Sequence, residues 1–156
     1  MRRLFPLWVL DSGALGLLAL RLVIGVALMV HGYPKIMVAT SWMGPETHVA
    51  GWLQALSAVA EFGGGFALIL GFLTPLVCIG LIGNFLYALF VVHVAHHDPF
   101  ILPRGVQGES SELAVLYLAN AVMFLMVGPG VHSIDALLFN RPARRARQQP
   151  RVPAWH

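Results

Sequence analysis

Four long apolar stretches divide the chain, and polar or glycine- and proline-containing segments separate them. They cover residues 13–38, 49–72, 75–97 and 111–127. A helix needs about 20 residues to cross a hydrocarbon core of about 30 Å, and each stretch approaches or exceeds that length. The apolar runs are continuous rather than alternating, which favours helices over the strands of a membrane barrel. The pattern therefore predicts an all-α fold, an integral membrane four-helix bundle.

The segments between the stretches contain signals for helix ends. Thr74 and Pro75, following Gly71, predict a tight turn with proline in the first turn of the third helix. Ser110 and Ser111, ahead of Glu112, are candidate caps of the fourth helix, and the Gly-Pro-Gly sequence at 128–130 ends that helix.

The last part of the chain divides into two segments. Residues 131–139 carry apolar positions at helical spacing with polar positions between them, which predicts a short interfacial helix. We therefore expect one four-transmembrane-helix domain over residues 1–140. Residues 141–156 are rich in Arg, Gln and Pro, and we expect them to form a mobile, basic cytoplasmic tail.

Composition supports a lipid environment. Hydrophobic residues make up 58% of the 156 residues and charged residues 11%, whereas soluble domains carry about 25% charged residues. The chain has one cysteine, Cys78, in an apolar run. It can form no intrachain disulfide and cannot by itself supply the ligands of a cysteine-bound iron–sulfur cluster.

The net charge of +3 comes mainly from arginines near the two ends of the chain. These are Arg2, Arg3, Arg141, Arg144, Arg145, Arg147 and Arg151. Arginines that flank apolar spans set orientation in a membrane, so we do not expect nucleic acid to be a partner. Both termini are predicted to be cytoplasmic, and the segments near 39–48 and 98–110 to face the outside.

Ionisable residues in or beside the apolar stretches are the candidate functional residues, because such residues are costly within a membrane. They are Arg21, His31, Lys35, Glu61, His93, His96, His97 and Glu112. All but Arg21 are expected at or outside the membrane midplane. This one-sided distribution predicts a site in the outer half of the bundle.

Several chemistries fit this set. Glu61 and His31 are the candidate catalytic residues because they could move a proton to or from a quinone carbonyl. His93 with His96 or His97 could hold a metal, and His31 with Glu61 could complete its ligands. His31 and His93 could instead hold haem. The structural alternatives are an Arg21–Glu61 ion pair, a Lys35 side chain that reaches the headgroups, and histidines that bond neighbouring carbonyls.

Several segments resemble the DoxX family of small four-span membrane proteins, over about residues 15–139. Segment 20–35 begins with Leu-Arg-Leu and ends with His-Gly-Tyr-Pro-Lys, and segment 61–75 begins with Glu-Phe-Gly-Gly-Gly and ends with Thr-Pro. His93 on the third span, Glu112 before the fourth, and Gly-Pro-Gly with Ser-Ile-Asp in segment 128–135 follow in the family's order. The resemblance implies a four-helix membrane bundle. Relatives include a membrane subunit of a thiosulfate:quinone oxidoreductase and parts of an oxidoreductase complex linked to oxidative stress.

The leading hypothesis is a redox-linked subunit of the bacterial inner membrane that binds a quinone or similar molecule. Arg21, Lys35, His93 and Glu112 would line its site with the two catalytic candidates. One alternative is a non-catalytic accessory or assembly subunit of a larger membrane complex, and another is a histidine-based metal or haem protein. Expected partners are the lipid bilayer and other membrane subunits or further copies of the chain.

Overall fold

The computed structural model describes residues 12–139, and within that range the chain forms helices and no strands. The helices are α1 (Ser12–Met37), α2 (Gly51–Leu70), α3 (Thr74–Tyr87), the π-helix η1 (Ala88–His93), α4 (Glu112–Val127) and α5 (Ile134–Phe139). The predicted all-α fold is confirmed. The basic residues on which the predicted orientation depends, and the predicted tail at 141–156, lie outside the described residues.

Among residues 12–139, three helical segments are long and apolar enough to cross a membrane: α1, α2, and α3 continued by η1. Helix α4 is also apolar but has 16 residues, or about 24 Å at about 1.5 Å per residue. All four helices leave many large apolar side chains exposed, including Val23, Val59, Ile79 and Met126. Hydrocarbon is the medium in which such surfaces are stable.

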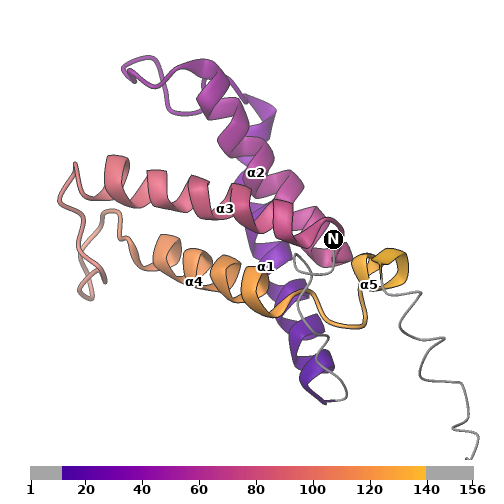
Figure 1. The fold of residues 1–156 in the computed structure, drawn as a ribbon. Coiled ribbons are helices and arrows are strands. Elements are labelled where there is room, and N and C mark those ends of the chain that lie inside the picture. The colour runs from indigo at the N-terminus through magenta and orange to yellow at the C-terminus, as the bar shows by residue number, and fades with distance from the viewer. Residues whose placement is uncertain (1–11, 140–156) are drawn as a thin grey trace, which may run out of the picture.

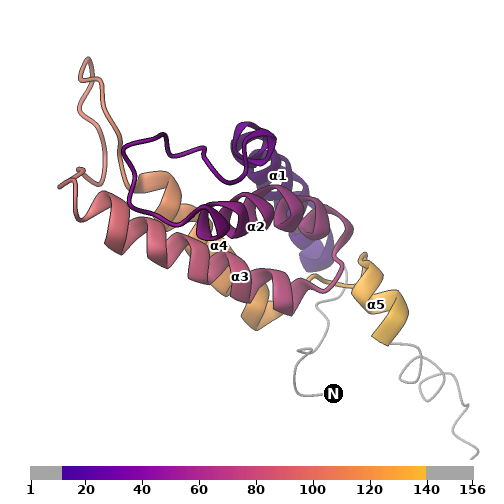
Figure 2. The same cartoon turned by 90° about the horizontal axis from the view of Figure 1, so that it is seen from above.

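The helices form two pairs that cross each other. Figure 1 shows α3 and α4 side by side, with α1 and α2 running across them, and Figure 2 shows α2 between α1 and α3. We call the end that contains residues 38–50 and 94–111 the long-loop end. The other, with residues 71–73 and 128–133, is the short-loop end. Helices α2 and α3 diverge from the turn at 71–73 toward the long-loop end (Figure 1).

Glycine brings α1 and α2 into close contact. A Cβ atom at Gly25 would lie 2.7 Å from the carbonyl oxygen of Gly65, and a Cβ atom at Gly32 would lie 2.5 Å from the backbone nitrogen of Phe62. Small residues at such crossings allow the close backbone approach that stabilises helix pairs in membranes. Gly32 lies one turn before Lys35, so this contact brings the end of α1 against the middle of α2.

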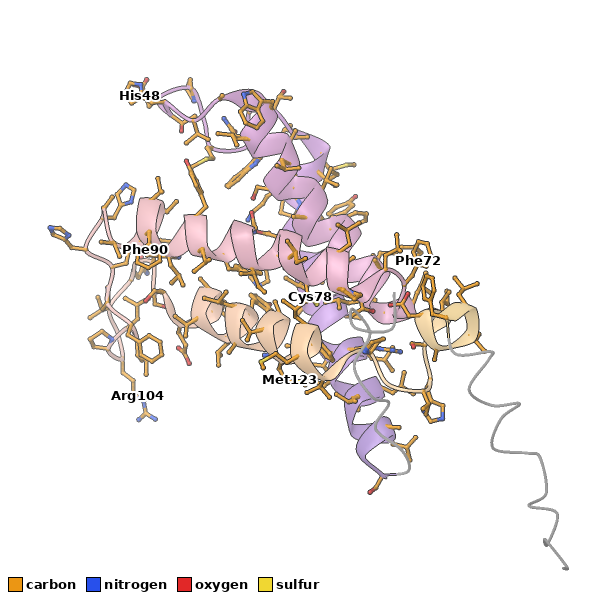
Figure 3. The ribbon with its side chains drawn as sticks, viewed as in Figure 1. His48, Phe72, Cys78, Phe90, Arg104 and Met123 are labelled. Atoms are coloured by element: carbon orange, nitrogen blue, oxygen red, sulfur yellow. The ribbon has the colours of Figure 1, made fainter. Side chains whose placement is uncertain are left out.

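The buried core joins α1, α2, α3 and α4. It contains Leu17, Leu28, Leu68, Cys78, Leu81, Phe85, Ala114, Tyr117, Ala121 and Phe124. Figure 3 shows Cys78 inside the bundle, where its thiol is fully buried and free. Its surroundings are those of a small apolar residue, as the sequence suggested.

Three local features refine the predicted helix ends. The turn before α3 is confirmed, because Gly71 adopts a left-handed conformation (φ +61°) and α3 starts at Thr74 with proline in its first turn. Ser111 occupies the position before α4, but its side chain makes no capping hydrogen bond. Helix α5 starts later than residue 131, because the Ser133 hydroxyl accepts the Ala136 N–H at 3.1 Å and so caps the helix there.

The π-helical end of the third span was not predicted. Its residues, Ala88–His93, are as apolar as an ordinary helical segment, so the hydrophobic pattern does not distinguish the two forms. Single π-helical turns are rare and are frequent at functional sites. Here Ala88 and Val92 of this turn line the pocket described below.

Candidate functional site

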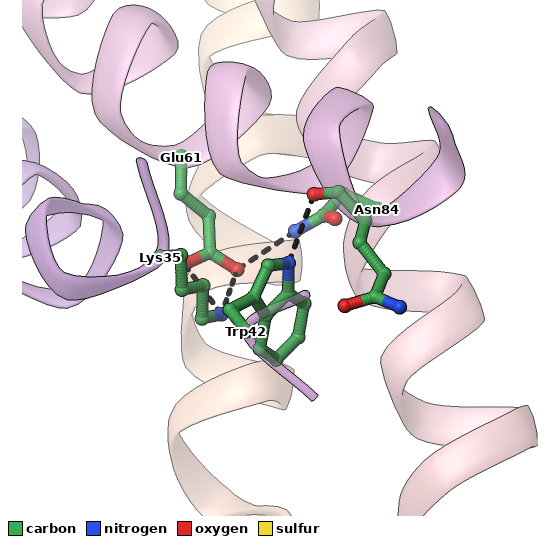
Figure 4. Close-up of polar contacts among 5 residues, drawn as sticks. Lys35, Trp42, Glu61 and Asn84 are labelled. Carbon is green, nitrogen blue, oxygen red and sulfur yellow. Dashed lines mark hydrogen bonds and ion pairs between the residues drawn. The ribbon is translucent and has the colours of Figure 1, made fainter. Parts of the chain in front are cut away.

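The carboxylate of Glu61 lies where three helices meet, 4% exposed on α2. The Lys35 ammonium, from the last turn of α1, lies 2.7 Å from both carboxylate oxygens. The side-chain amide of Asn84, from α3, donates a hydrogen bond to Oε1 at 3.0 Å (Figure 4). The arrangement pairs a charge that would be costly alone in a membrane and ties α1, α2 and α3 to one group.

The loop that follows α1 closes over this ion pair. The Lys35 ammonium lies 4.6 Å from the centre of the Trp42 ring, within range of a cation–π interaction. The indole N–H of Trp42 donates to the backbone carbonyl of Gln54 at 2.9 Å (Figure 4). The buried Gln54 side chain accepts the Met43 N–H at 3.0 Å and donates to the Val49 carbonyl at 2.9 Å. Gln54 therefore fastens both ends of the loop to α2.

A cavity of about 420 Å³ lies beside the ion pair, between α2 and α3. It is lined by Lys35, Trp42, Met43, Val49, Leu53, Gln54, Leu56, Ser57, Ala60, Glu61, Ile79, Gly80, Gly83, Asn84, Tyr87, Ala88 and Val92. The volume falls within the usual range of small-molecule sites, about 300–1,000 Å³. Most of its wall is apolar, and its two charged side chains, Lys35 and Glu61, meet the Asn84 amide at one place on it.

His31 and Glu112, both predicted site residues, do not line this cavity. The exposed His31 ring packs edge-on to Tyr117 of α4, with ring centres 5.9 Å apart, and Tyr117 stacks on Phe85 of α3 at 5.3 Å. Glu112 opens α4, and its side chain makes no hydrogen bond or ion pair with another residue of the described range. A negative charge at this helix N-terminus interacts favourably with the helix dipole.

The three histidines at the end of the third span do not converge. His93 pairs through Nδ1 with the Asp98 carboxylate at 2.8 Å. His96 and His97 are exposed and contact the backbone carbonyls of Val92 and Val94. Within residues 12–139, no group of three or more His, Cys, Asp or Glu side chains is positioned to hold a metal ion. The structure therefore does not assemble the metal site that the spacing of His93, His96 and His97 suggested.

Arg21 lies at the short-loop end, away from Glu61. Its guanidinium donates hydrogen bonds of 2.7 Å to the carbonyls of Pro129 and His132. The Arg21–Glu61 ion pair considered from the sequence is wrong, because Lys35 is the partner of Glu61. Depth estimates placed the two charges within reach of each other, but a long arginine side chain can point toward either end of its helix.

Asp135 is the second buried charge at the short-loop end. Its carboxylate accepts the backbone N–H groups of Leu73 and Thr74 at 2.7 and 2.8 Å, at the start of α3. Its own N–H donates to the Gly71 carbonyl at 2.9 Å. A carboxylate at a helix N-terminus is stabilised by the unpaired N–H groups and the helix dipole. Asp135 therefore joins α5 to the turn between α2 and α3.

Sequence reasoning overlooked four residues of these sites: Trp42, Gln54, Asn84 and Asp135. Gln54 and Asn84 carried a usable signal, because uncharged polar side chains within spans also need partners. Trp42 lies near a span end, where tryptophan is common at the membrane interface without any specific partner. Asp135 belonged to the closing family pattern, but its partners at 73 and 74 are distant in sequence and only the fold brings them together.

These apolar helices, with charges paired inside the bundle, define a helical integral membrane protein that crosses the membrane several times. The chain belongs to the DoxX family, whose sequence profile matches residues 16–94. It is 29% identical over 131 residues to the inner membrane protein YqjF of Escherichia coli (strain K12), covering 79% of this chain and 92% of that protein. No solved structure matches the fold significantly. The profile match includes Arg21, Lys35, Glu61 and Asn84.

Proposed function

We propose that this chain is a redox-linked membrane subunit that binds a quinone, or a similar lipophilic molecule with a polar head, in the cavity between α2 and α3. One observation carries the proposal: an apolar cavity in the bundle ends on a small, hydrogen-bonded polar cluster. Ligand sites typically combine apolar walls with a few convergent polar groups. The DoxX family membership is consistent with a membrane role but does not specify the ligand.

The polar cluster suits a neutral, hydrogen-bonding head. Lys35 and Glu61 neutralise each other at 2.7 Å, so a net charge on the ligand would lack a counter-charge here. Asn84 uses one amide hydrogen on Glu61, and its side-chain oxygen has no hydrogen-bond partner among residues 12–139. Asn84 and Lys35 can therefore donate to a carbonyl, and Asn84 can accept from a hydroxyl.

Glu61 is the group of this cluster that could exchange a proton with the ligand. Its carboxylate lines the cavity and is held in place by two donors from neighbouring helices. A proton-transfer group must lie within hydrogen-bonding reach of the atom it serves, directly or through one water. His31 lies outside the cavity wall, so the proposed site consists of Lys35, Glu61 and Asn84.

Equilibrium binding of a short-tailed quinone to the purified chain in lipid nanodiscs tests the proposal. We expect saturable binding to one site, weakened at least about tenfold by Gly83→Leu, which would occupy the cavity. A Cβ atom at Gly83 meets no heavy atom within 4 Å, so the folded backbone leaves room for a side chain to begin there. Gly16→Leu is the matched control, because Gly16 is equally open but lies on α1, outside the cavity.

Glu61→Gln keeps the size of the side chain and removes its charge, so it should weaken binding while Gly16→Leu leaves it unchanged. Absence of saturable binding to the unmodified chain would overturn the proposal, as would full binding by Gly83→Leu. A stoichiometric protein partner in a preparation that retains no quinone would favour the accessory-subunit alternative.

A further inference from the structure

The cavity between α2 and α3 is covered on its long-loop side. Trp42, Met43 and Val49 belong to the loop between α1 and α2, and all three line the cavity. Hydrogen bonds from or to Gln54 hold each of them. Gln54 is 3% exposed, so this attachment is itself shielded from solvent. A ligand that arrived over Trp42, Met43 and Val49 would have to displace a loop held by these three hydrogen bonds.

The edge of the cavity that faces away from the bundle is different. Leu56 and Ile79 line the cavity and are 61% and 58% exposed. Each lies five residues from a polar group of the cluster, Leu56 from Glu61 and Ile79 from Asn84. At about 100° per residue, five residues correspond to a rotation of about 140° around a helix. The polar cluster therefore faces the bundle, and Leu56 and Ile79 mark the opposite edge.

Small residues occupy the wall between that edge and the polar cluster. Ser57 and Ala60 line it from α2, and Gly80 and Gly83 line it from α3. Neither glycine would meet a heavy atom within 4 Å if it carried a Cβ, and both glycines are exposed. At these two positions α3 presents bare backbone to the cavity, between Ile79 at the edge and Asn84 at the polar cluster.

We propose that the ligand enters this cavity sideways from the bilayer, through the opening bounded by Leu56 and Ile79. The inference rests on the proposed function and adds the route and the ligand class: a molecule that partitions into lipid and presents a flat, uncharged head. The head passes Ser57, Ala60, Gly80 and Gly83 to reach Lys35, Glu61 and Asn84. An apolar tail then remains in the hydrocarbon beside Leu56 and Ile79, where an apolar surface is already exposed.

Binding rates in nanodiscs test the route. The double variant Leu56→Trp/Ile79→Trp narrows the opening and leaves the polar cluster intact. We expect association and dissociation of a short-tailed quinone each to slow by about tenfold. The matched control is Val23→Trp/Val59→Trp, which adds the same rings at exposed positions outside the cavity. It should leave both rates unchanged.

Tail length gives a second measurement on the unmodified chain. At equal mole fraction in the membrane, quinones with short and long isoprenoid tails should associate at the same rate if they come from the bilayer. A rate that falls with tail length, following the aqueous concentration, would overturn the inference. So would unchanged rates in Leu56→Trp/Ile79→Trp. Both results concern rates in a chain that binds quinone at equilibrium, whereas failure of the proposed function would appear as no equilibrium binding at all.

Discussion

The two ends of the bundle stabilise buried charges with different kinds of partner. At the short-loop end, Arg21 and Asp135 are 1% and 0% exposed, and their partners are backbone groups of the link between α4 and α5 and of the start of α3. At the long-loop end, Lys35 and Glu61 pair with each other, and the Lys35 side chain is 26% exposed. Arg21 and Asp135 each join separate segments of the chain, whereas Lys35 and Glu61 lie beside a cavity. A buried charge in a membrane protein is therefore a functional candidate only after its partners are known.

The nature of the partners explains the contrast. The N–H groups at the start of α3 have no partner within their helix, and the carbonyls of Pro129 and His132 lie in a buried link outside any helix, so Asp135 and Arg21 complete hydrogen bonding that the fold needs. Lys35, Glu61 and Asn84 join side chains, and any of the three can be replaced while all backbone hydrogen bonds remain. Substitutions at the short-loop end should therefore lower stability and leave ligand affinity unchanged. Substitutions in the Lys35–Glu61–Asn84 cluster should weaken ligand binding and have a smaller effect on stability.

Arg21→Met should have the largest effect on stability. It leaves the carbonyls of Pro129 and His132 without their donor, and loss of two charge-assisted hydrogen bonds should cost about 3 kcal/mol of unfolding free energy. Denaturant or thermal unfolding in detergent micelles measures it. Quinone affinity of the fraction that remains folded should be unchanged.

Arg104→Met is the matched control for Arg21→Met. Arg104 is an exposed cation in the loop before α4 (Figure 3), and its removal should leave stability within about 0.5 kcal/mol of the unmodified chain. A stable Arg21→Met protein with lost quinone binding would reverse the comparison. It would assign a binding role to the short-loop end and a structural one to the cavity.

Much of the fold could be predicted from the sequence, because membrane spans follow from local composition. Continuous apolar runs predicted all four long helices, and Gly71 with Pro75 predicted the turn between the second and third. The π-helical turn at Ala88–His93 was missed because α- and π-helical segments share the same hydrophobic pattern. It is a difference in hydrogen bonding, and composition does not report it.

The candidate site could be predicted only in part. Depth along a helix placed Lys35 and Glu61 at or outside the membrane midplane, but it does not say which way a side chain turns. It therefore grouped His31 and Arg21 with Glu61, although His31 packs on Tyr117 and Arg21 reaches Pro129. The cavity depends on the divergence of α2 from α3, which is a tertiary property that no single helix encodes.

The Lys35–Glu61 pair should contribute less to stability than Arg21. In Glu61→Gln the amide oxygen can still accept the hydrogen bond from Asn84, so the change removes mainly the ionic interaction. We expect a loss of about 1–2 kcal/mol for Glu61→Gln or Lys35→Met, and less than the sum for the double variant, because removing both charges leaves neither unpaired. The free energies of unfolding of the unmodified chain, the two single variants and the double variant, measured in one detergent, give the coupling energy between the two charges. Strict additivity would show that the two charges do not stabilise each other.

Trp42→Leu should have the smallest effect on stability and still distinguish the two ends of the bundle. It removes the ring that lies 4.6 Å from the Lys35 ammonium and the donor to the Gln54 carbonyl. The two losses together should cost about 1 kcal/mol of unfolding free energy. The cation–π contact is weak because the Lys35 side chain is partly exposed, and the loop keeps the hydrogen bonds of Met43 and Val49 with Gln54. Trp52→Leu is the control, since Trp52 is 68% exposed on α2 and lies outside the cavity wall. If the loop only covers the ion pair, the association rate of a long-tailed quinone should be the same in both variants. A faster rate in Trp42→Leu alone would show that the loop, and not the edge at Leu56 and Ile79, controls access to Glu61.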